Sequence, residues 1–132
     1  MPPPTLIPFC RHEYEKHGTC AEDVFPTMLG FMNGTLALRD KFDLTPALAA
    51  AGITPSTTKG FTPAALQAAA KAAFGFGVLP SCDKDGNIDG VVVCVGKDLA
   101  AQDCGSVKYG SCSANTLYLL PAEAQRGRRR RG

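Results

Sequence analysis

Two histidines, a glutamate and a lysine lie within six residues of one another near the start of the chain. They are His12, Glu13, Lys16 and His17, in the segment FCRHEYEKHGTC that covers residues 9–20. On a helix that turns about 100° per residue, these four side chains fall within an arc of about 140°. We therefore expect two imidazoles, a carboxylate and an ammonium group to share one helix face.

Such a group of side chains suits phosphoryl transfer from the 2′-hydroxyl of RNA. One imidazole can remove the hydroxyl proton, a cation can stabilise the charged phosphorane, and an acid can protonate the leaving 5′-oxygen. Glu13 can orient a neighbouring imidazole. The same residue types also fit a solvated, charged helix face with incidental i,i+4 pairs. The residues alone leave both interpretations open.

A metal site is the third interpretation of this segment. Zinc proteases place two histidines four residues apart, whereas His12 and His17 are five apart. Cys10, His12, His17 and Cys20 could together hold zinc, but their spacing matches no finger pattern. We therefore expect neither a metal nor a cofactor.

A second polar stretch, DKDGNID, spaces its oxygen ligands as calcium loops do. Asp83, Asp85, Asn87 and Asp89 alternate along the chain. The glutamate that closes an EF-hand loop would fall at residue 94, which is Cys94. The stretch therefore predicts a polar hairpin turn.

Composition and charge restrict the classes of function. The chain has 132 residues, 45% of them hydrophobic, and a net charge of +2. Removing the five arginines of RGRRRRG from the 14 basic residues leaves nine against 12 acidic ones, a net charge of −3. The body is thus no basic platform for nucleic acid, while the tail could attract phosphates. No apolar run approaches the roughly 18 residues of a membrane span, and no signal peptide is visible.

The order of the expected elements predicts an α+β fold, with helices followed by a small antiparallel sheet. Helices are expected in residues 9–20, ended by Gly18, in 27–44, in 45–53 with Thr45 as N-cap, and in 61–77 with Thr62 as N-cap. Strands are expected in 78–82, in 90–96 (buried on both faces) and in 115–121. We expect an extended proline-rich start in 1–8, one partial domain in 9–121 and a disordered arginine-rich tail in 122–132.

The segment HEYEKHGTC resembles the second active-site segment of the ribonuclease T2 family, which reads His-Glu-aromatic-x-Lys-His-Gly-Thr-Cys. All eight defined positions match, from His12 to Cys20. The downstream stretches LALRDKFDLTPALAAAGITPS, FTPAALQAAAKAAFG and VLPSC…GVVVCVGKD…C…C are also similar to the family, so the resemblance covers residues 9 to about 121. It implies a ribonuclease T2-like fold that lacks its N-terminal part.

The resemblance also implies an activity and roles for individual residues. It implies a metal-independent endoribonuclease that cleaves single-stranded RNA through a 2′,3′-cyclic phosphate, as a monomer that binds no membrane. His17 would be the general base, His12 and Lys16 would bind the phosphate, Glu13 and Lys16 would stabilise the pentacovalent state, and Tyr14 would have a packing role. The family is secreted or vacuolar/lysosomal, and the six cysteines also favour an oxidising compartment.

The family's cysteine pattern implies two nested disulfides, Cys82–Cys112 and Cys94–Cys104. Cys20 would lack its usual partner. On one straight helix Cys10 would lie about 15 Å from Cys20, beyond disulfide reach.

One departure from the family bears on activity. No segment similar to the family's first active-site segment, near Ile-His-Gly-Leu-Trp-Pro, precedes residue 9, and His12 and His17 are the only histidines. We therefore expect weak or absent cleavage. The alternative is a non-catalytic fragment that binds RNA or a partner through the basic tail.

Overall fold

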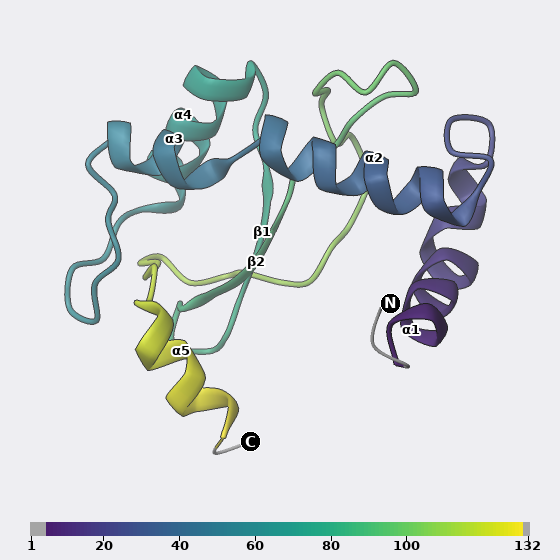
Figure 1. The fold of residues 1–132 in the computed structure, drawn as a ribbon. Coiled ribbons are helices and arrows are strands. Elements are labelled where there is room, and N and C mark those ends of the chain that lie inside the picture. The colour runs from purple at the N-terminus through teal and green to yellow at the C-terminus, as the bar shows by residue number, and fades with distance from the viewer. Residues whose placement is uncertain (1–4, 131–132) are drawn as a thin grey trace. The chain divides into compact units, whose positions relative to one another are not determined.

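The computed structural model describes residues 5–130, and the chain divides into two compact units, residues 1–42 and 43–132 (Figure 1). The first unit contains α1 (Leu6–Glu13), the π-helix η1 (Tyr14–Gly18), the 3₁₀-helix η2 (Thr19–Ala21) and α2 (Met28–Lys41). The second contains α3 (Leu44–Ala50), α4 (Pro63–Phe74), β1 (Leu79–Cys82), β2 (Ile88–Val92) and α5 (Ala122–Arg129). The region predicted as one partial domain, 9–121, therefore spans two units.

The first unit begins with helical structure that runs without a break through residues 6–21. Of the start predicted as extended, residues 1–4 lie outside the described range, whereas residues 6–8 are helical. Pro8 is compatible with the helix because it lies in the first turn, where its missing N–H needs no intrahelical partner. Gly18 does not end the helix as expected. Its φ of −94° is right-handed, and its role comes from close packing, described below.

Helix α2 starts where the sequence predicts, directly after Pro26. The Thr27 side chain caps it by accepting a hydrogen bond from the Gly30 N–H at 3.0 Å. The helix ends before Phe42. Local capping chemistry therefore determines this element.

The two helices that open the second unit, α3 and α4, form where the sequence predicts them, and one of the two predicted N-caps is wrong. Thr62 caps α4 by accepting from the Ala65 N–H at 3.1 Å, and Gly75 ends it in the left-handed conformation, with φ of 85°. In α3, Asp43 rather than Thr45 is the N-cap, since its carboxylate accepts the Thr45 N–H at 3.1 Å. The helix therefore starts earlier than predicted, because Asp43, two residues before Thr45, supplies the capping oxygen.

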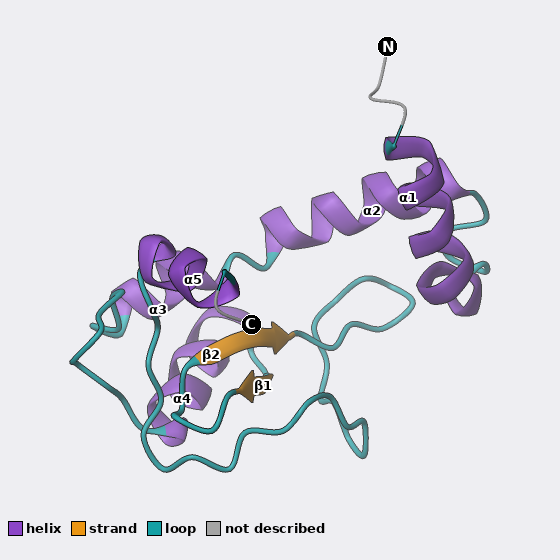
Figure 2. Cartoon of the chain, turned by 90° about the horizontal axis from the view of Figure 1, so that it is seen from below, coloured by secondary structure: helices purple, strands orange, loops and turns teal. Residues whose placement is uncertain are grey.

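Strands β1 and β2, drawn in orange in Figure 2, form an antiparallel pair with Leu79 opposite Val92. The register shifts between Ser81 and Cys82. The polar turn that joins the strands is confirmed, and Gly86 adopts a φ of 84° there, which glycine tolerates best. Helices followed by a small antiparallel sheet confirm the predicted α+β class.

Two of the strand predictions are wrong. The apolar run at residues 90–96 is not buried on both faces, because the sheet within the described residues has only two strands and β2 is at most half-buried. Residues 115–121 form no regular strand. They make isolated bridges, Phe61 with Leu117 and Asn87 with Tyr118.

All the buried hydrophobic side chains of the described residues lie in the second unit. They are Leu48, Ile53, Leu66, Ala69, Ala70, Val78, Leu117 and Leu120. In residues 5–42 only Gly18 is buried. The hydrophobic core therefore belongs to the second unit alone.

Both predicted disulfides form, Cys82–Cys112 and Cys94–Cys104, and both lie in the second unit. Cys10 and Cys20 are free thiols.

The C-terminal segment differs from its prediction as a disordered tail. Residues Ala122–Arg129 form helix α5, with the acidic Glu123 in its first turn, where the positive end of the helix dipole favours it. Arg128 contacts Asp83 of the hairpin turn, which ties this short helix to the sheet. Residues 131 and 132 lie outside the described range. No helix in residues 5–130 is both long and apolar enough to cross a bilayer.

Candidate active site

The four candidate catalytic residues occupy the junction of two helix types in the first unit. His12 and Glu13 end α1, and Lys16 and His17 lie in η1. The Thr19 N–H bonds to the Tyr14 carbonyl, five residues back, which widens the turn. Each residue then advances by less than the usual 100°, so side chains four apart line up more closely than on an α-helix. Such π-turns occur often at functional sites.

The structure brings Glu13 and His17 together. His17 Nε2 lies 3.9 Å from Glu13 Oε2, and the two side chains are 59% and 35% exposed. This separation is longer than a hydrogen bond, but it lets the carboxylate attract and orient the imidazole. Catalytic hydrogen bonds are often long in a free protein and shorten when the substrate binds.

His12 and Lys16 are exposed on the same helical segment. No hydrogen bond or ion pair joins either side chain to another described residue. The helical backbone places His12 and Lys16 on the predicted face. The contact observed on this face joins Glu13 and His17, and it includes neither His12 nor Lys16. Both side chains are therefore accessible to an anion from solvent.

An aromatic cluster within the first unit supports this segment. The Tyr14 ring lies 5.7 Å from the Phe31 ring, and the Phe25 ring packs edge-on against Phe31 at 6.2 Å. The Tyr14 hydroxyl also donates to the Pro26 carbonyl at 3.4 Å. These contacts confirm the packing role expected for Tyr14. They hold η1, which carries Lys16 and His17, beside α2.

Two glycines allow these aromatic rings to approach the backbone. A Cβ added to Gly18 would clash with the Tyr14 ring and lie 3.0 Å from Phe31 Cγ. One added to Gly34 would clash with the Phe25 ring. Sequence reasoning missed Phe25, Phe31 and Gly34 as supporting residues. The ring that packs on Gly34 is that of Phe25, which precedes the helix, so helical spacing gives no signal for this contact.

The residues of the alternative zinc site do not converge. Within residues 5–130, no group of three or more His, Cys, Asp or Glu side chains is placed to share a metal ion. The thiol of Cys10 is half-buried, whereas Cys20 is exposed. The arrangement of Cys10, His12, His17 and Cys20 thus gives no four-ligand site.

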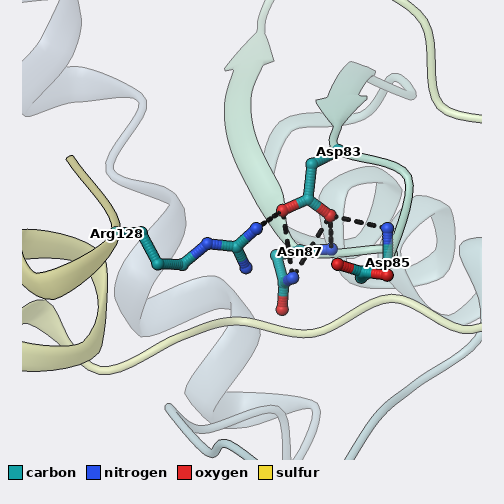
Figure 3. Close-up of polar contacts among 4 residues, drawn as sticks. All are labelled: Asp83, Asp85, Asn87 and Arg128. Atoms are coloured by element: carbon teal, nitrogen blue, oxygen red, sulfur yellow. Dashed lines mark hydrogen bonds and ion pairs between the residues drawn. The ribbon is translucent and has the colours of Figure 1, made fainter. Parts of the chain in front are cut away.

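A second polar centre, in the other unit, surrounds Asp83 (Figure 3). Its carboxylate accepts the Asp85 N–H at 2.9 Å, the Asn87 N–H at 3.0 Å and the Asn87 side-chain amide at 3.0 Å, and it pairs with Arg128. Burial raises the pKa of Asp83, but the bonds from Asn87 and Asp85 and the charge of Arg128 outweigh burial and lower it. The DKDGNID stretch is thus a hydrogen-bonded turn that holds an arginine.

Known proteins resemble most of this chain in sequence. The model of the ribonuclease T2 family matches residues 5–104. Ribonuclease 1 of Arabidopsis thaliana is 32% identical over 115 residues, covering 83% of this chain and 49% of the relative. Extracellular ribonuclease LE of Solanum lycopersicum is 31% identical over 115 residues, with 83% and 50% covered. The chain spans about half the length of these relatives.

Solved structures give the same result for the fold. Human RNase T2 superimposes with a TM-score of 0.76 at 27% identity, covering 89% of this chain and 63% of the other. RNase NT, solved in complex with 5′-AMP, gives 0.74 at 27% identity, with 87% and 58% covered. Trichomaglin, described as an S-like ribonuclease, gives 0.72 at 34% identity, with 81% and 50% covered. Because the family model matches residues 5–104, most of the sequence, the chain belongs to the ribonuclease T2 family.

Proposed function

We propose that this chain is a metal-independent endoribonuclease of T2 type that cleaves single-stranded RNA weakly, through a 2′,3′-cyclic phosphate. The observation that carries the proposal is the Glu13–His17 pair, 3.9 Å apart on the segment that resembles the family's active-site motif. An imidazole beside a carboxylate, exposed to solvent, is suited to take a proton from a ribose hydroxyl.

In the proposed reaction, the imidazole of His17 removes the proton of a 2′-hydroxyl through the ring nitrogen that does not face Glu13. The 2′-oxygen attacks the adjacent phosphorus, the bond from phosphorus to the 5′-oxygen breaks, and the cyclic phosphate forms. The imidazolium that results is stabilised by the carboxylate of Glu13. Lys16 and His12 bind the phosphate oxygens, where negative charge develops in the pentacovalent state.

The proposed rate is weak because no histidine is left to act as the general acid for the leaving 5′-oxygen. This sequence has two histidines, and in this proposal His17 is the base and His12 binds the phosphate. The leaving 5′-oxygen then takes its proton from water. A missing general acid costs roughly 10²–10⁴ in rate.

The test is the release of cyclic phosphate from an oligouridylate in the presence of a chelator. His17→Ala should abolish release, and Glu13→Gln should reduce it. Glu15→Gln, an exposed carboxylate on the same turn outside the proposed face, serves as the matched control and should leave the rate unchanged. Cleavage that survives His17→Ala would come from a contaminating nuclease and would refute the proposal.

We also propose that the protein is a monomer located outside the cell or in a vacuole or lysosome. One relative is named an extracellular ribonuclease, and two disulfides persist best in an oxidising compartment. Sedimentation of the oxidised protein tests the first part of this proposal, and localisation of the tagged natural protein tests the second.

A second candidate function is RNA binding without cleavage, through the basic C-terminal helix. It is favoured by the exposure of Arg126 and Arg130 at the end of the chain. Deletion of residues 122–132 separates the two functions. If binding collapses on that deletion but survives His12→Ala, the second candidate is favoured. If binding depends on His12 and cleavage on His17, the first candidate holds.

A further inference from the structure

Helix α5 sorts its arginines onto two sides. At about 100° per residue, Arg126 and Arg130 lie four apart on one side, and Arg128 lies about 160° away from Arg126 on the other. Arg130 keeps helical backbone angles, with φ of −80° and ψ of −15°. The Arg128 side faces the hairpin, because Arg128 pairs with Asp83, and Gln125 and Arg128 line one hollow together with residues of the hairpin. The Gln125 side chain also donates to the carbonyl of Leu120, just before the helix, at 2.8 Å. Arg126 and Arg130 are exposed.

The contact between Arg128 and Asp83 is peripheral to the turn that it joins (Figure 3). The carboxylate of Asp83 already accepts hydrogen bonds from Asp85 and Asn87, so it stays satisfied when the arginine leaves. Arg128 is 45% exposed and Asp83 is 27% exposed, and ion pairs this close to solvent contribute little. The guanidinium can therefore exchange Asp83 for another anion at low cost.

The helix itself is short and weak. It has eight residues, including Gly127 in its interior, and a helix of that length is marginal in isolation. The like charges of Arg126 and Arg130, four residues apart, further destabilise it. A chain of phosphates would remove this repulsion by neutralising both arginines.

The hollow between α5 and the hairpin has a volume of about 120 Å³ and includes Asp83 and Asp89 in its lining. Pockets for small molecules typically have about 300–1,000 Å³, so this hollow is too small for a nucleotide. Its carboxylates also repel phosphate. A polyanion must therefore lie outside this hollow, along the exposed side of the helix, where the long side chain of Arg128 can meet it only after leaving Asp83.

We propose that α5 is an arm that binds the phosphate backbone of RNA, and that Arg128 leaves Asp83 for a phosphate when RNA binds, so that Asp83 competes with RNA for this arginine. The polyanion is RNA because this inference rests on the proposed function, in which RNA is the substrate. Arginine forms bidentate hydrogen bonds with phosphate as well as with carboxylate, so the bonds that Arg128 loses at Asp83 are replaced at the phosphate.

The experiment measures binding of a 2′-O-methyl oligouridylate, which lacks the nucleophile and cannot be cleaved, at salt concentrations of about 50–200 mM. Each phosphate contact contributes about 0.7 to the slope of log affinity against log salt for single strands. We expect Arg126→Gln, Arg130→Gln and Arg128→Gln each to reduce the slope by about 0.7. Lys59→Gln, an exposed lysine outside α5, is the charge-matched control and should leave the slope unchanged.

Asp83→Asn tests the competition directly. The asparagine keeps an oxygen that can accept the N–H groups of Asp85 and Asn87, but it loses the charge that holds Arg128. We expect the oligonucleotide to bind about two- to fivefold more tightly with an unchanged salt slope. Circular dichroism checks that the variant is folded.

Each alternative outcome overturns a definite part of the inference. An unchanged slope for Arg128→Gln beside a reduced slope for Arg126→Gln would mean that Arg128 stays on Asp83. Unchanged or weaker binding by Asp83→Asn would refute the competition. Arginine-dependent binding of phosphatidylserine vesicles without oligonucleotide binding would identify a lipid surface as the partner. If the slopes behave as expected but cyclic phosphate is never released, only the proposed catalysis fails.

Discussion

Residues 5–42 and residues 43–130 differ in what they bury and in what they expose. The second unit holds the whole hydrophobic core of the described chain and both disulfides. The first unit has no buried hydrophobic side chain, and it exposes Phe9 at 59% and Leu29 at 68%. Yet the first unit carries all four candidate catalytic residues and both free thiols.

The buried core and the candidate catalytic residues therefore lie in separate parts of the chain. Structure in the first unit is supported by three aromatic rings: the Tyr14 ring packs tilted against Phe31, and the Phe25 ring packs edge-on against it. Regions with few buried apolar contacts open more easily than a core does. The candidate site therefore lies on the less stable unit, where the side chains can adjust to a substrate.

The largest expected effect comes from matched leucine truncations in the two units. Leu66 is fully buried, so Leu66→Ala should lower the free energy of unfolding by about 2–5 kcal/mol. Leu36 is 62% exposed, so Leu36→Ala should change it by no more than about 0.5 kcal/mol. Urea denaturation followed by circular dichroism measures both. Equal losses for the two variants would show that the first unit has a core of its own.

The two disulfides are expected to stabilise the second unit by different amounts. Cys82 and Cys112 are 30 residues apart, whereas Cys94 and Cys104 are 10 apart. Loop-closure entropy predicts losses of about 4 and about 3 kcal/mol for the two paired Cys→Ser replacements. Thermal denaturation of each double variant tests this order. Replacing Cys10 and Cys20 instead should leave stability nearly unchanged, because neither thiol is bonded.

A substitution at Gly18 tests the first unit separately. Gly18→Ala places a methyl group against the Tyr14 and Phe31 rings, which should cost about 1–3 kcal/mol locally. It should disturb the segment that carries His17 and lower the release of cyclic phosphate. Hydrogen exchange in α4 should not change if the two units open independently. Faster exchange in α4 would show that they open together.

The smallest effect is a pH dependence at Asp83. The pKa of this carboxyl is lower in the folded protein than its ordinary value of 3.8, so its ionised form stabilises the fold. That stabilisation is complete above pH 3.8 and is lost as the pH falls through the folded pKa. Acid titration of wild type against Asp83→Asn measures it. The variant should lose less stability between neutral pH and acid than the wild type does.

Local signals in the sequence predicted the elements that depend on neighbours a few residues away. Thr62 was predicted as the N-cap of α4, because a cap needs only the next few residues. The two disulfides followed from the family resemblance rather than from spacing. The predicted strand at 115–121 failed because a strand needs a partner at the right distance, and residues 115–121 find only isolated bridges.

The sequence by itself determined the residue types of the candidate site, the helical periodicity that places them on one segment, and the N-cap of α4. Only the tertiary structure decided that Gly18 serves ring packing, that the core lies wholly in residues 43–130, and that the arginine-rich end is a helix tied to Asp83. The physical reason is distance along the chain. Arg128 and Asp83 are 45 residues apart, and no local rule of spacing brings such side chains together.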